Sequence, residues 1–141
     1  VSYIAPLGVF DDDYKSGISV NAIAHLKWLR EGAEMQIISG YDYFPQKNNY
    51  PFGHISVIPL RMGILQMLSK ELYIYGRAGI VGAKDEISKF SIRPSIDGGI
   101  GLTIKKISID LGWHGWFRKR SIRMSDYFSA GVVVPFRRKF F

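Results

Sequence analysis

The sequence of 141 residues contains no cysteine and no apolar run long enough for a transmembrane helix. The absence of cysteine excludes disulfides, zinc–thiolate sites and thiol catalysis. A helix that spans a bilayer needs about 18 or more consecutive apolar residues, so no such helix is expected. A transmembrane β-barrel is compatible with this composition, because its strands alternate apolar and polar residues and escape a hydropathy average.

Charged residues are also scarce, at 22%, whereas glycine (15 residues) and aromatic residues (14%) are abundant for a compact helical domain. The hydrophobic content of 47% excludes disordered and low-complexity classes. The length fits one domain, so we expect a single barrel domain over residues 1–136 and a short basic and aromatic tail over 137–141. The chain begins at Val1 without the charged and apolar segments of a signal peptide, so we expect any such peptide to have been removed.

Alternation with a period of two predicts β-strands along most of the chain. It is clearest in four segments, residues 18–28, 92–104, 107–117 and 128–136. It is less regular in three others, residues 33–43, 54–67 and 72–81. An eighth strand is expected over residues 2–9, where Pro6 interrupts it, and Pro94 predicts a bulge or a late entry into its strand.

The connections between these segments alternate strictly between short and long. Short turns are expected at residues 30–32, 68–71 and 105–106. Long polar connections are expected at 10–16, 44–53, 82–90 and 117–124. This order predicts an all-β fold, an eight-stranded antiparallel up-and-down transmembrane β-barrel, with all short turns at one end and all long loops at the other.

The composition of the two strand faces indicates which face is the interior. A soluble barrel would turn a face rich in Lys and Glu to water, whereas the polar face here is mostly Gly, Ser, Thr and Asn. Its few charges have both signs, which predicts ion pairs across a narrow lumen. The candidates are Glu34, Arg61, Arg77, Asp97 and Asp110. The apolar face is nearly free of charge in the four clearest strands, as a lipid-facing surface requires, since a Lys or Arg at mid-bilayer costs about 2–4 kcal/mol.

Aromatic residues are expected to form two bands around an aliphatic middle, like the girdles of outer-membrane barrels. Trp28 and Phe136 would lie at the short-turn end. The band at the long-loop end would contain Tyr41, Tyr43, Trp113, Trp116, Tyr127 and Phe128. The alternative is that these residues are simply good strand formers.

The segment 129–136, SAGVVVPF, resembles the C-terminal assembly signal of bacterial outer-membrane proteins, with Gly131, Val134 and the aromatic Phe136 at the pattern positions. The family usually ends at the aromatic, whereas residues 137–141 follow it here. The segments 58–63, 72–79, 98–101 and 109–113 are similar to hairpins of small OmpA/OmpX-like barrels, especially the Bacteroidetes-type outer-membrane β-barrel family. The resemblance implies a place in the bacterial outer membrane. The expected partners are the lipid bilayer, lipopolysaccharide, the outer-membrane assembly machinery and other outer-membrane proteins.

The last long loop carries a basic cluster formed by Arg118, Lys119, Arg120 and Arg123. It could bind lipopolysaccharide phosphates or an acidic partner, and the alternative is a solvated run of charges. No nucleic-acid partner is expected, because the chain has no basic helix or recognised binding motif. No cofactor or metal is expected either. The glycines at 98–101 lack the strand-before and helix-after context of a nucleotide loop, and the three histidines lack ligand spacing.

We therefore expect a non-enzymatic structural or accessory protein, either a subunit of a larger outer-membrane complex or a surface-binding module. One alternative is a soluble, lipocalin-like barrel that binds an apolar ligand, which predicts an apolar lumen and a polar exterior. Another is a lipid A-modifying enzyme, in which His114, Ser125 and Asp126 would meet near the long-loop end.

Overall fold

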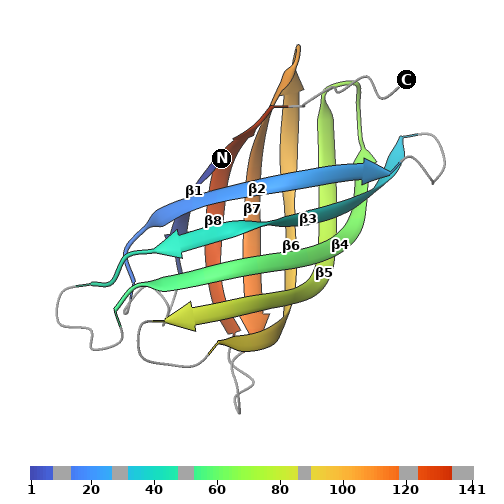
Figure 1. Cartoon of the computed structure of the whole chain (residues 1–141). Helices are drawn as coiled ribbons and strands as arrows, with labels where there is room; N and C mark the ends of the chain where they lie inside the picture. Colours follow the sequence, from blue (N-terminus) through green and yellow to red (C-terminus); the bar gives the residue numbers. More distant parts are fainter. Residues whose placement is uncertain (8–13, 27–31, 48–52, 86–89, 118–123, 135–141) are drawn as a thin grey trace, which may run out of the picture.

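The computed structural model describes residues 1–7, 14–26, 32–47, 53–85, 90–117 and 124–134. They form a closed barrel of eight antiparallel strands, in which each strand pairs with the next and β1 pairs with β8 (Figure 1). The predicted eight-stranded, up-and-down antiparallel barrel is confirmed. In the described part of the chain, no helix is long and apolar enough to cross a membrane.

Seven of the eight strands contain ten or more residues. The strands are β1 (Ser2–Pro6), β2 (Gly17–Leu26), β3 (Ala33–Phe44), β4 (Ile55–Met67), β5 (Leu72–Asp85), β6 (Ser91–Ile104), β7 (Ile107–Phe117) and β8 (Met124–Val133). A strand that crosses a bilayer needs about 9–11 residues, so these seven are long enough to do so.

The predicted short turns at residues 68–71 and 105–106 lie at the same end of the barrel, as expected, whereas residues 30 and 31 of the third predicted turn lie outside the described residues (Figure 1). Lys105 and Lys106 alone connect β6 to β7, and Lys105 adopts a left-handed backbone with φ 58°. At the turn between β4 and β5, the Ser69 hydroxyl accepts a hydrogen bond from the Leu72 amide at 3.0 Å. These local contacts reverse the chain within a few residues, so the neighbouring strands pair in register.

Prolines affect the strand ladders differently from the prediction. Pro94 produces no late entry, because β6 runs from Ser91 and Pro94 pairs with Ile80 of β5. On the side of β6 that faces β7, the pairing begins only at Ser95, so Pro94, which has no N–H to donate, lies just outside the β6–β7 ladder. Pro59 does interrupt a ladder: the β3–β4 pairing stops at Ser39–Leu60 and resumes in the same register at Asp42–Val57.

The last strand also differs from the prediction. The structure begins β8 at Met124 instead of residue 128, and ends it at Val133. The added residues pair with the end of β7, for example Tyr127 with His114 and Ser125 with Trp116. Val134 follows the strand, and Phe136 lies outside the described residues.

The barrel interior is filled by three layers of side chains. An apolar cluster at the long-loop end contains Phe44, Val57, Val81, Trp116 and Tyr127, together with Ile4, Tyr14 and Ala83. A smaller cluster of Leu65, Tyr73 and Tyr75 lies at the short-turn end. Buried polar and charged side chains separate the two clusters. These buried charges contradict the wholly apolar lumen expected of a lipocalin-like barrel, and large exposed side chains such as Leu60 and Met62 contradict its polar exterior.

Candidate functional site

The centre of the interior is occupied by a buried ion-pair network from three neighbouring strands. Arg77 of β5 donates from Nε to Asp97 Oδ1 of β6 at 2.8 Å, and Arg61 of β4 donates from Nη1 to Asp97 Oδ2 at 3.2 Å. All three side chains are 4% exposed or less. Arg77 also lies over the ring of Tyr75, 4.2 Å from its centroid. The structure thus brings together three of the five predicted lumen charges.

His114 of β7 extends this network toward β8. Its Nδ1 lies 3.2 Å from Asp97 Oδ2 and 3.1 Å from Arg61 Nη1. Its Nε2 lies 2.7 Å from the Ser129 hydroxyl. The aspartate, imidazole and hydroxyl are therefore in the order found in hydrolase triads, although this group is inside the barrel.

The trio of His114, Ser125 and Asp126, on which the alternative of a lipid A-modifying enzyme depends, does not form. Ser125 is buried and faces the interior, whereas Asp126 faces outward and accepts a hydrogen bond from Trp113 Nε1 at 3.2 Å. Neighbouring residues of a strand face opposite sides of the sheet, so Ser125 and Asp126 cannot both reach His114. The site that this alternative requires is therefore not seen in the described residues.

A second buried polar cluster surrounds Asp42 of β3. Ser19 donates to Asp42 Oδ1 and Tyr127 donates to Asp42 Oδ2, each at 2.5 Å. The Tyr127 ring stacks on His114, with centroids 4.7 Å apart, and packs edge-on against Phe44 and Trp116. Tyr127 therefore joins the charge network to the apolar cluster at the loop end.

The remaining two predicted lumen charges have other partners, nearer the short-turn end. Asp110 accepts a hydrogen bond from the Tyr73 hydroxyl. Glu34 lies 3.0 Å from His25 Nδ1 in a pair that is partly exposed, with 41% of His25 and 29% of Glu34 accessible. An ion pair of either residue with Arg61 or Arg77 is not seen in the described residues.

The exterior of the barrel is apolar over almost its whole height. Large exposed side chains include Leu60, Met62 and Ile64 of β4 and Ile96, Ile100 and Leu102 of β6. On this face of the described strands, Lys84 and Asp126 are the only charged side chains, and both lie at the long-loop end.

The aromatic band at the long-loop end differs in part from the prediction. Tyr41, Tyr43 and Phe128 are exposed on the outside, as are Phe90 and Phe117, and Trp113 is half-buried there. Trp116 and Tyr127 are instead inside the barrel, at 4% and 1% exposure. Their positions in the period-two pattern turn them inward. Trp28 and Phe136, expected in the other band, lie outside the described residues.

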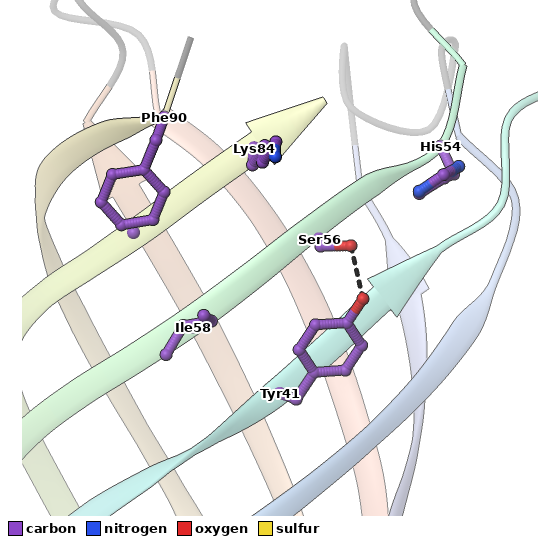
Figure 2. A pocket seen from close by; sticks show the side chains of 7 residues that line it. Tyr41, His54, Ser56, Ile58, Lys84 and Phe90 are labelled. Atoms are coloured by element: carbon purple, nitrogen blue, oxygen red, sulfur yellow. Dashed lines mark hydrogen bonds between the residues drawn. The ribbon is translucent and has the colours of Figure 1, made fainter. Parts of the chain in front are cut away.

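A groove opens on the outer surface at the loop end, across β3, β4 and β5 (Figure 2). Its volume is about 500 Å³, and its lining residues are Tyr41, His54, Ser56, Ile58, Gly82, Lys84 and Phe90. The Tyr41 hydroxyl and the Ser56 hydroxyl share a hydrogen bond of 2.6 Å across the groove. No sequence pattern pointed to this site, because its residues come from three strands and from the ends of two different loops.

Two other predicted sites are described only in part. The basic loop residues Arg118, Lys119, Arg120 and Arg123 all lie outside the described residues. In the assembly-signal segment, Gly131 faces the interior beside the Ser2 side chain of β1, and Val134 is 58% exposed. The function of this segment stays a prediction.

Two solved structures have similar backbones. The Yersinia pestis outer membrane protein Ail, solved in a phospholipid bilayer nanodisc, has a TM-score of 0.59 and 10% identity, covering 92% of this chain and 96% of Ail. Neisserial surface protein A has a TM-score of 0.57 and 14% identity, covering 96% of this chain and 92% of that protein. At such identities the likeness shows the fold alone. No protein-family model and no curated protein matches the sequence, so membership of the OmpA/OmpX-like or Bacteroidetes-type family stays a prediction.

Proposed function

We propose that this protein is an integral β-barrel of the bacterial outer membrane with a non-enzymatic, structural or accessory role. The exterior face of the described strands carries this proposal, because its only two charges lie at one end of the barrel. Exposed side chains such as Leu60, Ile100 and Leu111, each 44% exposed or more, would be unfavourable in water and are stable against lipid. The fold shared with an outer membrane protein studied in a bilayer supports the same location.

A transport role for the barrel is disfavoured by its interior. Arg61, Tyr127, Phe44 and Val57 are among the largest fully buried side chains, and they project into the lumen from three different strands. Eight strands enclose only enough space for side chains, so a filled interior leaves no path for a solute. The filled interior therefore supports a role performed by the outer surface or the loops.

A hydrolase role is disfavoured by the surroundings of His114. His114 Nδ1 lies 3.2 Å from Asp97, as in a hydrolase triad, but it also lies 3.1 Å from Arg61 Nη1, whose positive charge opposes the charge that a general base must acquire. His114 is only 6% exposed, and its ring is covered by Tyr127. We propose that the hydrogen bond between His114 and Ser129 ties β7 to β8, and that the protein acts without catalysis. It would then act as a subunit of a larger outer-membrane complex or as a surface-binding module.

The experiment that tests the proposal is refolding in the presence and absence of a bilayer. The urea-unfolded chain is diluted into phosphatidylcholine vesicles or into buffer alone, and each sample is run unboiled and boiled on an SDS gel. We expect a fast-migrating, heat-sensitive band with vesicles only. A protein that reaches the same folded form in buffer would contradict the proposal.

A further inference from the structure

Lys84 is the one cation on the exterior face of the described strands, and it lies in the outer groove. We propose that this groove binds a phosphate-bearing lipid of the outer leaflet, with the phosphate at Lys84 and an acyl chain along the apolar part below. The inference rests on the proposed function, because it requires that this face meets lipid.

The strand register places Ser56 and Lys84, two of the polar residues that line the groove, in one row across β4 and β5. Ser56 pairs with Tyr43 of β3 on one side and with Lys84 of β5 on the other. His54 adjoins this row, with its ring centroid 5.2 Å from that of Tyr43. Lysine supplies charge, and hydroxyl groups supply hydrogen bonds, for phosphate oxygens. None of the described residues that line the groove is a carboxylate, so an anion meets no opposing charge there.

The next rows away from the loops are apolar. Ile58 pairs with Gly82, and Leu60 pairs with Ile80. All three large side chains of these rows are exposed, at 48% for Ile58, 52% for Leu60 and 44% for Ile80. The Phe90 ring covers Gly82, where an added Cβ would overlap it, and so forms one wall of the groove (Figure 2). Successive outward residues on a strand are about 6.6 Å apart, so the apolar surface begins one such step from the row of Ser56 and Lys84.

The position along the strand fits the boundary between headgroups and chains. Lys84 is near the loop end of β5, which runs from Leu72 to Asp85, while a strand needs only about 9–11 residues to cross the apolar core. Lysine at such a boundary keeps its ammonium among headgroups while its stem contacts apolar surface. The row of Ser56 and Lys84 would contact the anionic head of an amphiphile, and the two apolar rows of Ile58 and Leu60 would contact its chain. A folded acidic protein would lack the acyl chain that the lower rows accommodate.

Lipid binding can be measured by native mass spectrometry of the folded protein released from neutral detergent micelles. The probes are bisphosphorylated lipid A and phosphatidylcholine, and the test variant is Lys84→Gln. Lys106→Gln is the matched control, since Lys106 is an exposed lysine in the turn at the other end of the barrel. Inorganic phosphate is added as a competitor. We expect one tightly held lipid A per wild-type chain, weakened about five- to tenfold in Lys84→Gln and unchanged in Lys106→Gln. Phosphatidylcholine should bind more weakly, and millimolar phosphate should not displace lipid A.

A second variant tests the apolar part of the groove. Ile58→Trp fills it without changing charge, and it should also weaken lipid A binding. Equal binding by wild type and Lys84→Gln would overturn the inference, as would equal loss in both lysine variants or full displacement by free phosphate. Each sample is also run unboiled on a gel. Wild-type protein that shows no heat-sensitive band contradicts the proposed function itself, whereas a folded barrel without lipid A preference contradicts only the groove assignment.

Discussion

Replacing Asp97 with alanine should destabilise the barrel more than any single charge change at its surface. The carboxylate is fully buried, and it accepts hydrogen bonds from Arg77 Nε at 2.8 Å and Arg61 Nη1 at 3.2 Å. Its removal leaves two guanidinium groups, 4% exposed or less, without their counter-charge. Arg61 already has one buried nitrogen, Nη2, without a hydrogen-bond partner. Breaking a buried pair by removing one partner costs about 3–5 kcal/mol, so we expect a loss of this size in the free energy of unfolding.

The assay is urea unfolding of the protein in phosphatidylcholine vesicles, followed by tryptophan fluorescence and by the unboiled gel band. The matched control is Glu34→Gln, which breaks the partly exposed pair with His25 and should cost about 0–1 kcal/mol. Both variants should still reach the outer membrane, because neither alters the exterior face. An Asp97→Ala barrel within about 1 kcal/mol of wild type would refute the reasoning, since it would mean that water reaches the arginines and replaces the carboxylate.

Three further predictions follow from the two faces of the barrel. Leu60→Arg places a charge at mid-height on the exterior, so it should lower the free energy of unfolding in vesicles by about 2–4 kcal/mol. Ser56→Arg places the same charge at the loop end and should lower it by only about 0–1 kcal/mol. Equal effects of the two variants would contradict a lipid-facing exterior. Gly79→Ala should cost about 1–3 kcal/mol, because its Cβ would overlap the backbone of β4, whereas Gly76→Ala on the same strand meets nothing within 4 Å and should be nearly neutral in the same titration. A fluorophosphonate probe should leave Ser129 unlabelled in the folded barrel by mass spectrometry, and labelling that requires His114 would contradict a structural role for this pair.

The period-two pattern predicted the strands well, because one buried face in every strand strongly specifies register. The predicted bounds of β7 agree with the structure at both ends, and those of β4 and β6 agree to within one residue. The start of β8 was missed because Asp126 breaks the apolar pattern on its outer face. Asp126 is accommodated there by its hydrogen bond to Trp113 at the loop end of the barrel.

The partners of the lumen charges could be predicted only in part. Opposite signs on one face predicted ion pairs among the lumen charges, and the register places two of them, Arg77 and Asp97, directly opposite each other on β5 and β6. The sequence does not contain the distances across the lumen, which decide that His114 joins Asp97 and that Asp110 pairs with Tyr73. Tyr127 and Trp116 could have been placed inside by applying the strand parity to the ends of β7 and β8, instead of counting every aromatic at the loop end as part of the girdle.

The central claim is that the apolar exterior faces lipid, and the absence of cysteine makes a direct measurement simple. A single cysteine is introduced at Ile100, which is 44% exposed on the outside of β6, or at Lys106 in the short turn. Each is labelled with a nitroxide, and its accessibility to oxygen and to a water-soluble nickel chelate is measured in phosphatidylcholine vesicles. The account predicts that the label at Ile100 is accessible to oxygen, which concentrates in the bilayer, and protected from nickel, while the label at Lys106 shows the reverse. Nickel accessibility at Ile100 equal to that at Lys106 would show an exterior in water and contradict the account.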